Sequence, residues 1–416
     1  MRLLLQQTEA DVSDAERAGS HGHIVKTRLV LNFPGFEQTD AIRQLDRIRH
    51  SALKTGEIWG FSFERQTAEM APSGHHAESE ATTTGGNWQT RTRIAQFSWN
   101  DVIRGYEEDG HPHGFLINMP KFLAFFFDGT VRRYRKASPR YWAFTIFPVL
   151  LLAIFLAVSA LASHWLLGLV LAQGSIRLAL TVLATIVLTL ILAKWPGDRM
   201  YLLLTINDWG FARDMVNRAN PAIDRRYEEF AEVLGEEISN SKHDEIIISG
   251  HSFGSLWAVA ALAIALEKNP GLLRGRRVTF LALGSSLLKI ALAPGAQFMR
   301  TWIRRVLAEP DLYWHEIQTK DDIIAFYKAD PFETLDIRDF AATMKIDRVN
   351  FKKAVSKKRF RSIRTSFYRM HRQYILYGDN RVPFDYMLRL FGPFRARDLA
   401  ETPELADRID PQGNLV

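Results

Sequence analysis

The most regular pattern of hydrophobic and polar positions lies between residues 225 and 271. Apolar residues recur at three- and four-residue steps over 225–241, which predicts an amphipathic helix. Residues 246–248 are three consecutive isoleucines, as expected of a short strand that is covered on both faces. Residues 255–268 are rich in Ala and Leu and predict a second helix, which ends at Asn269-Pro270-Gly271.

Similar patterns predict further elements along the chain. Strands are expected at 24–32, 57–64, 92–99, 277–283 and 312–319, and helices at 39–55, 102–106, 115–127 and 201–217. The polar stretch 65–90 is interpreted as a flexible surface excursion. Because strands and helices alternate, we expect an α/β fold with a mostly parallel sheet and helices on both of its faces.

Two uncharged apolar segments, 141–163 and 178–193, interrupt this alternation. A bilayer core needs about 20 such residues, so the first segment is long enough to span it. The second reaches that length only if residues 175–177 form its outer end, with Arg177 extending to the interface. The pair predicts a transmembrane helical hairpin. A buried hairpin in a soluble core and a re-entrant hairpin are the alternatives.

Charge and composition suggest where such a protein would reside. Lys and Arg residues cluster before the first segment, at 132–140, and after the second, at 194–199, so both flanks are expected on the cytoplasmic side of the cell (inner) membrane. The chain has no cysteine, which excludes disulfides and thiolate chemistry, and no cleavable signal peptide is expected. Its formal net charge of +7 suits an acidic partner such as nucleic acid or an anionic membrane.

These observations predict five regions. We expect a flexible leader over 1–22, the first part of the α/β domain over 23–140 and the hairpin over 141–195. The second part of the domain follows over 196–390, and a C-terminal tail over 391–416.

A motif with chemical meaning, Gly250-x-Ser252-x-Gly254, lies between the isoleucine strand and the helix that follows it. Such a turn can hold a serine hydroxyl exposed above the sheet edge, because glycines allow strand and helix to approach closely. The N-terminus of the helix places partial positive charge at the same point, which favours an oxyanion. A strand-to-helix turn without chemistry is the alternative.

This stretch resembles the nucleophile elbow of the α/β-hydrolase superfamily, which includes lipases and esterases. The resemblance implies a catalytic triad in the chain order Ser, Asp or Glu, then His, with Ser252 as the nucleophile. It also implies an oxyanion hole formed by the residue after the nucleophile, Phe253, and by a Gly-containing loop after an early strand. Here that loop is Pro34-Gly35-Phe36, with Pro34 where the family usually has His, and Phe36 is the implied donor.

The implied order leaves few choices for the acid and the base. Of twelve histidines, only His315 and His371 follow Ser252, and His315 lies within the strand that precedes the acid. His371 is therefore the expected base, although no clear strand precedes it. For the acid, Asp321 is favoured over its neighbour Asp322, because Asp-x-Ile after a strand is a pattern often seen in lipase-like hydrolases.

The expected activity is that of a membrane-anchored serine hydrolase acting on a lipid or another hydrophobic ester. The alternatives are a thioesterase or acyltransferase with the same triad, and a non-catalytic membrane protein with a hydrolase-like binding domain. No cofactor and no metal are expected, since no carboxylate cluster matches the pair His75-His76. Residues 345–372 contain eleven Lys or Arg and one acid, Asp347. This run is either a face for anionic lipid or a solvated surface, and no nucleic-acid motif accompanies it.

Overall fold

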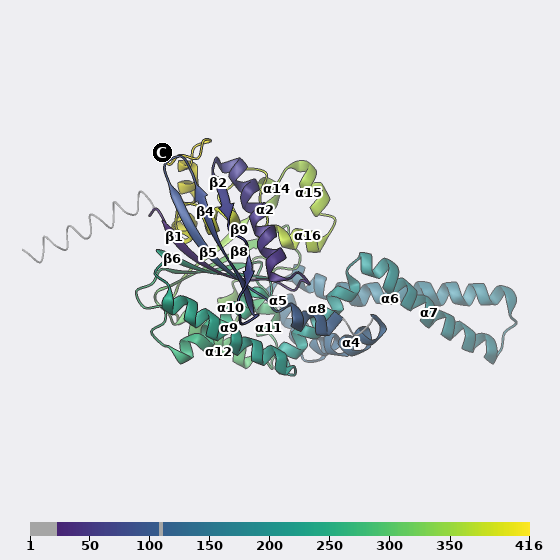
Figure 1. Cartoon of the computed structure of the whole chain (residues 1–416). Helices are drawn as coiled ribbons and strands as arrows, with labels where there is room; N and C mark the ends of the chain where they lie inside the picture. The colour runs from purple at the N-terminus through teal and green to yellow at the C-terminus, as the bar shows by residue number, and fades with distance from the viewer. Residues whose placement is uncertain (1–22, 108–110) are drawn as a thin grey trace, which may run out of the picture. The chain divides into compact units, whose positions relative to one another are not determined.

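The computed structural model describes residues 23–107 and 111–416, which form two compact units (Figure 1). Unit 1 consists of the described residues up to Asn100, together with Asp224–Leu288 and Phe298–Val416. Unit 2 consists of Asp101–Ile223 and Lys289–Gln297. The leader expected over 1–22 lies outside the described residues.

Unit 1 is built on a nine-stranded mixed sheet with the order β2-β4-β5-β1-β6-β7-β8-β9, and β3 pairs with β4 outside that path. Every pairing from β5 through β9 is parallel, whereas β4 runs antiparallel to β5 and β2 to β4. The fold is therefore α/β, with a mostly parallel sheet. The strands are β1 Thr27–Phe33, β2 Ser62–Arg65, β3 Glu69–Met70, β4 His76–Thr84, β5 Gln89–Phe97, β6 Glu245–His251, β7 Val278–Leu283, β8 Leu312–Thr319 and β9 Thr343–Val349.

Helices cover both faces of this sheet (Figure 1). On one face, α2 and α17 pack over the side chains of Val30, Ile94 and Ile247 in a single core cluster. On the other face, Phe230 of α9 packs against Phe33 and Phe97. The longer helices that lie wholly or mostly in unit 1 are α2 Ala41–Trp59, α9 Pro221–Asn240, α10 Gly254–Lys268 and α12 Gln297–Leu307.

Short helices make up much of the C-terminal part of unit 1. They are α13 Pro331–Thr334, α14 Phe351–Ala354, α15 Lys357–Ile363, α16 Phe367–His371, η1 Arg372–Ile375, α17 Tyr386–Phe391, α18 Ala396–Glu401 and η2 Pro403–Arg408. Residues 391–416, expected as a tail, include α18 and η2. Leu399 and Leu405 from these helices pack with Trp59 and Trp88 in a second core cluster. This stretch is therefore part of the packed structure of unit 1.

A buried ion pair joins the two central strands. Arg28 of β1 and Glu245 of β6 are partners in the parallel register, and the Arg28 Nε donates to the Glu245 carboxylate at 2.7 Å. Both side chains are almost completely buried. The remaining guanidinium nitrogens of Arg28 donate to the backbone carbonyls of Leu390, Gly392 and Phe394. One arginine thus links the centre of the sheet to the end of α17 and to the residues that follow it.

Two sequence expectations for the sheet were wrong. Residues 65–90 are not a flexible excursion, because they contain β3, β4 and the start of β5. β4 was missed because the small residues Ala77 and Ala81 face the core on this strand, in place of large apolar ones. The strand expected over 57–64 begins only at Ser62, because α2 continues to Trp59 and ends at Gly60 with a left-handed backbone.

Unit 2 is helical. Its elements are α3 Asn100–Glu107, α4 His111–Phe127, α5 Thr130–Ala137, α6 Pro139–Val170, α7 Ser175–Arg199 and α8 Leu202–Asn217, and α11 Leu287–Ala291 lies where the chain passes between the units. Within unit 2, Leu151 and Phe155 of α6 pack with Ala193 of α7 and with Leu202 and Ile206 of α8.

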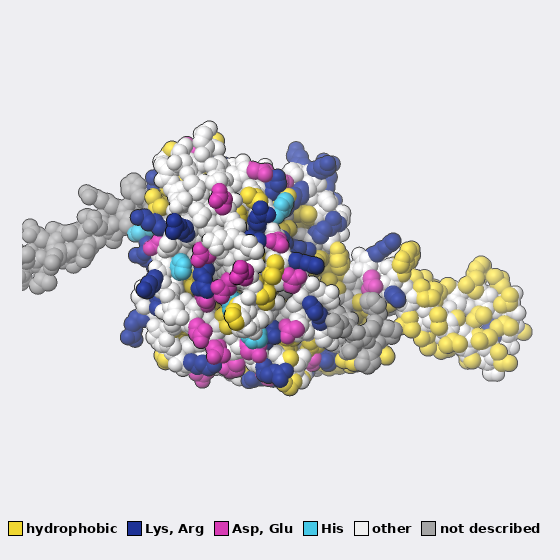
Figure 2. Space-filling view, viewed as in Figure 1, with side chains coloured by type: hydrophobic (Ala, Val, Ile, Leu, Met, Phe, Trp, Pro, Cys, Tyr) yellow, Lys and Arg dark blue, Asp and Glu magenta, His cyan; other side chains and the backbone are white. Residues whose placement is uncertain are grey.

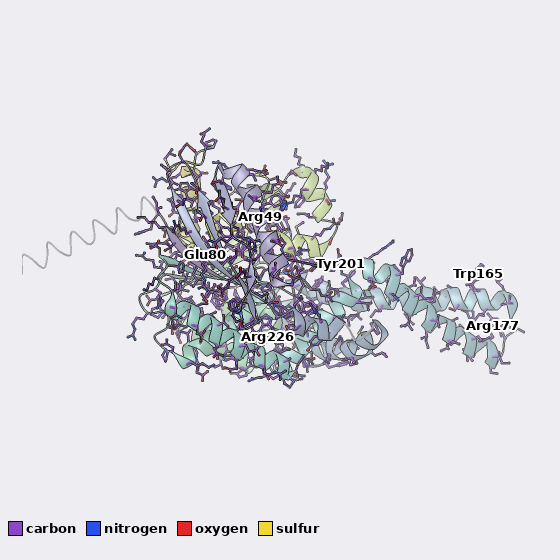
Figure 3. All side chains as sticks on the ribbon, in the orientation of Figure 1. Arg49, Glu80, Trp165, Arg177, Tyr201 and Arg226 are labelled. Carbon is purple, nitrogen blue, oxygen red and sulfur yellow. The ribbon has the colours of Figure 1, made fainter. Side chains whose placement is uncertain are left out.

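Helices α6 and α7 are long and apolar enough to cross a membrane, by length and composition. They form an antiparallel hairpin whose large apolar side chains are mostly exposed, and these cover its outer part in Figure 2. Soluble proteins rarely expose so large a contiguous apolar surface. Trp165 and Arg177 lie at the outer end of the hairpin (Figure 3), where Arg177 donates to the carbonyl oxygens of His164 and Leu171. α7 begins at Ser175, so residues 175–177 do form the outer end of the second segment.

Candidate active site

Ser252 occupies a strained turn between β6 and α10. Its φ of 56° lies in the left-handed region, which is uncommon for a residue with a side chain. At both flanking glycines there is no room for a side chain. A Cβ on Gly254 would lie 2.0 Å from the backbone oxygen of Phe33, and a Cβ on Gly250 would lie 2.6 Å from the Cα of Ser255. Strand β1 and helix α10 therefore approach one another so closely that the turn has little freedom.

Four adjacent parallel strands deliver the candidate residues to one edge of the sheet. In the register, Phe33 of β1 is opposite Gly250 of β6, and His251 of β6 is opposite Leu283 of β7. β8 continues the same alignment, with Ile317 opposite Leu283. The segments that follow these strands carry Phe36, Ser252, Ser286 and the pair Asp321-Asp322. Ligands of open α/β sheets usually bind at this carboxyl edge.

His371 and Asp322 form a buried pair at this edge. The His371 Nδ1 lies 2.7 Å from the Asp322 Oδ2, and both side chains are nearly inaccessible to solvent. The second carboxylate oxygen of Asp322 accepts from the backbone N–H of Ile324 at 2.9 Å. Because a carboxylate can only accept, Nδ1 must carry the proton, and Nε2 then has a lone pair. Nε2 is buried and has no hydrogen-bond partner among the described residues.

Asp321, the acid favoured from the sequence, does not contact His371. Its Oδ2 accepts from the backbone N–H of Phe351 at 3.1 Å, at the start of α14. Consecutive residues in a turn point in different directions, so only one of the two carboxylates can reach the base. The structure brings together His371 and Asp322, and the preference for Asp321 is corrected accordingly.

The hydroxyl of Ser252 has a serine as its partner. The Oγ atoms of Ser252 and Ser286 lie 3.3 Å apart, and the backbone N–H of Ser286 donates to the carbonyl oxygen of Ser252 at 3.2 Å. No hydrogen bond joins Ser252 to His371 in the described part of the chain. Ser286 was not predicted as a site residue, and only its position just after a strand could have indicated it.

His251 links the turn that carries Ser252 to His371. Its ring centroid lies 4.6 Å from that of His371, and its Nε2 lies 3.0 Å from the His371 carbonyl oxygen. Burial, reinforced by the neighbouring His371, lowers the pKa of His251 well below its usual value. The neutral ring therefore donates its proton from Nε2 to the carbonyl oxygen. This contact places His371 beside the residue that immediately precedes Ser252.

The two residues expected to form the oxyanion hole lie side by side. The rings of Phe36 and Phe253 have centroids 6.2 Å apart. Gly35 brings the loop after β1 against the turn, since a Cβ there would lie 3.0 Å from the Cβ of Ser252. The indole nitrogen of Trp99 donates to the carbonyl oxygen of Pro34 at 3.0 Å and fixes the same loop. The loop after β1 and the start of α10 thus meet next to Ser252.

Other titratable groups have separate roles. His315 is buried in β8 with its Nε2 2.8 Å from the Asp347 carboxylate, and burial lowers its pKa to about 4. His76, Glu78 and Glu237 bring possible metal ligands within 4.8 Å of one another. However, Arg93 donates to both of these carboxylates, so a guanidinium already occupies the position of a cation between them.

A cavity of about 250 Å³ lies elsewhere in unit 1. Its wall includes Phe351, Tyr374, Phe384 and Tyr386, and it includes none of Ser252, Asp322 and His371. This cavity is therefore separate from the candidate active site.

No protein family, no curated protein and no solved structure matches this chain. The interpretation of the site consequently depends on its own geometry.

The close approach at Gly254 yields a prediction about stability. Gly254→Ala should destabilise the protein by about 1–3 kcal/mol or more, because the new methyl group would overlap the backbone oxygen of Phe33. Gly271→Ala is the matched control, since the nearest atom to its Cβ would be 3.9 Å away. Thermal unfolding of the purified chain measures both variants. Equal midpoints for the two would contradict the packing described for the turn.

Proposed function

We propose that this chain is a membrane-anchored serine hydrolase of the α/β-hydrolase type, which cleaves a lipid or another hydrophobic carboxylic ester. The observation that carries the proposal is the buried pair of His371 and Asp322, with Nε2 unpartnered, at the sheet edge that also carries the strained Ser252. This combination of nucleophile, base and orienting acid is the arrangement that acyl transfer requires.

In the proposed reaction, the Ser252 hydroxyl turns from Ser286 towards His371 and gives its proton to Nε2 as Oγ attacks the ester carbonyl carbon. The carbonyl electrons move to the oxygen, and the resulting oxyanion is held by the backbone N–H groups of Phe253 and Phe36. Collapse of this intermediate breaks the C–O bond, and the leaving alcohol takes the proton from His371. Water then repeats the sequence on the acyl-enzyme and releases the carboxylic acid.

The roles of the supporting residues follow from electrostatics. Asp322 stabilises the imidazolium that forms at His371 and keeps the Nδ1 proton in place. Ser286 holds the resting hydroxyl of Ser252. The close approach of β1 and α10 keeps the donor groups organised before charge develops, so little reorganisation is needed during the reaction.

The hairpin formed by α6 and α7 is proposed to cross the membrane as two spans. Arg135 and Arg199 lie over the rings of Trp142 and Trp195, an arrangement suited to an interface where cations and aromatic residues meet lipid head groups. The Lys and Arg residues at both flanks favour a cytoplasmic location for both soluble parts. Attachment to a bilayer favours a hydrophobic substrate that is supplied by that bilayer.

Replacement of the nucleophile tests the chemistry. Ser252→Ala should lower turnover of a hydrophobic ester by a factor on the order of 10⁴ to 10⁶, because the covalent step is lost. A fluorophosphonate probe should label the native chain at Ser252 and leave this variant unlabelled. Absence of labelling in the folded native chain, or a loss of turnover below about tenfold, would contradict the proposal.

The adjacent aspartates provide a matched pair of variants. Asp322→Asn should reduce turnover by a factor on the order of 10⁴, because the amide no longer orients and stabilises the protonated base. Asp321→Asn should keep turnover within about tenfold, because its amide oxygen can still accept from Phe351. Steady-state kinetics on both variants decides between the two acids, and the reverse order of effects would assign the acid to Asp321.

Extraction of membranes with alkaline carbonate tests the hairpin. The chain should stay in the membrane pellet, since two apolar helices of this length hold it in the hydrocarbon core. Release of the folded chain into the supernatant would overturn the proposed spans and would leave the catalytic proposal standing.

A further inference from the structure

A long run of positive charge precedes and follows the proposed base. From Arg348 to Gly378 the chain contains ten Lys or Arg residues and no Asp or Glu, and this run is called the basic segment here. It begins at the end of β9 and includes α14, α15, α16 and η1. His371 lies within it, at the end of α16.

Most of these cations lack an acidic partner. Among the residues that the structure describes, only Arg359 and Arg372 of the basic segment lie within 4 Å of a carboxylate, namely those of Asp379 and Glu37. Eight are exposed and have no such partner: Arg348, Lys352, Lys353, Lys357, Lys358, Arg361, Arg364 and Arg369. Other exposed cations of unit 1 do pair with acids, as Lys54 does with Glu57 and Lys268 with Glu228. Most of the charge of the basic segment is therefore not neutralised by the acids that the structure describes.

The basic segment has an apolar side and a charged side. Val355, Ile363 and Met370 are buried in the core of unit 1 and hold it in place. Lys357, Arg361 and Arg364 are spaced four and three residues apart, so they share one outward face at α15. Figure 2 shows Lys and Arg side chains gathered over the region that Figure 1 labels α14 and α15. The segment thus presents a cationic surface on a fixed support.

We infer that the basic segment is a docking surface for the anionic lipid head groups of a bilayer. Unneutralised cations that are held on one face bind such a surface by electrostatic attraction. A lipid surface is favoured over nucleic acid because the apolar hairpin offers attachment to a bilayer, and no nucleic-acid-binding motif accompanies the charge. The inference rests on the proposed membrane attachment and does not depend on the catalytic chemistry.

Docking at this surface would connect lipid composition to the proposed active site. α15 leads through Arg364–Ser366 into α16, which carries His371 at its end. Contact between α15 and head groups would therefore hold α16, which carries the proposed base His371, at the boundary between lipid and water. Ester bonds of lipids lie at that boundary, so the surface would present the site to anionic membranes in particular.

A single fluorescent label can test the docking directly. The native chain has no cysteine, so Ser362→Cys, at an exposed position of α15, gives one labelling site. The labelled full chain is placed in nanodiscs that contain a head-group quencher lipid, with either neutral lipid alone or about 30% anionic phosphatidylglycerol. Quenching should be at least about threefold stronger in the anionic discs than in the neutral discs. This extra quenching should disappear at about 1 M salt, where the screening length is only about 3 Å.

Two charge-reversal variants with the same change in net charge provide the comparison. Lys357→Glu/Lys358→Glu/Arg361→Glu should abolish the extra quenching. Lys242→Glu/Arg274→Glu/Arg304→Glu, which reverses three exposed cations elsewhere in unit 1, should keep it. Equal quenching in neutral and anionic discs, or equal loss in both triple variants, would overturn the inference. Because this readout needs no turnover, its failure is distinguishable from failure of the catalytic proposal, which the fluorophosphonate probe reports.

Discussion

The buried pair of Arg28 and Glu245 is the contact on which the rest of unit 1 depends. It joins residues that are opposite one another in β1 and β6, and a shift of register would leave two charges buried without partners. The same register sets Phe33 beside Gly250, and so determines where the loop after β1 meets the turn that carries Ser252. Because Arg28 also binds the carbonyl oxygens of Leu390 at the end of α17 and of Gly392 and Phe394 just after it, the C-terminal segment is held by the same side chain.

The elements that depend on local sequence could be predicted. The isoleucine run, the glycines around Ser252 and the Ala- and Leu-rich helix are contiguous in the sequence. In each of them the residue type alone indicates the local structure, namely a buried strand, a tight turn and a helix. The strand over 312–319 was also predicted with its observed bounds, because it opens on the large apolar and aromatic residues Leu312, Tyr313 and Trp314. The apolar helices α6 and α7 were recognised for a similar reason, although α6 continues to Val170, beyond the segment expected from charge alone.

Features that depend on distant contacts could not be predicted. Asp321 and Asp322 are neighbours in one turn, and what separates them is Phe351, which binds Asp321 from thirty residues away. β9 was missed because its side chains are only partly buried and several are charged. Ser286 gave no signal because a serine after a strand is common, and its contact with Ser252 arises from the pairing of β6 with β7.

The order of the sheet has a consequence for biosynthesis. Arg28 and Glu245 are 217 residues apart, and α6 and α7 lie between them in the chain. β1 and β5 therefore leave the ribosome before the hairpin, while their neighbours β6 to β9 emerge after it. If the hairpin enters the bilayer as it is made, the first strands must wait at the membrane with an open edge until the later ones arrive. Insertion then precedes assembly of the sheet, and a nascent chain that failed to insert would be exposed to aggregation before any site existed.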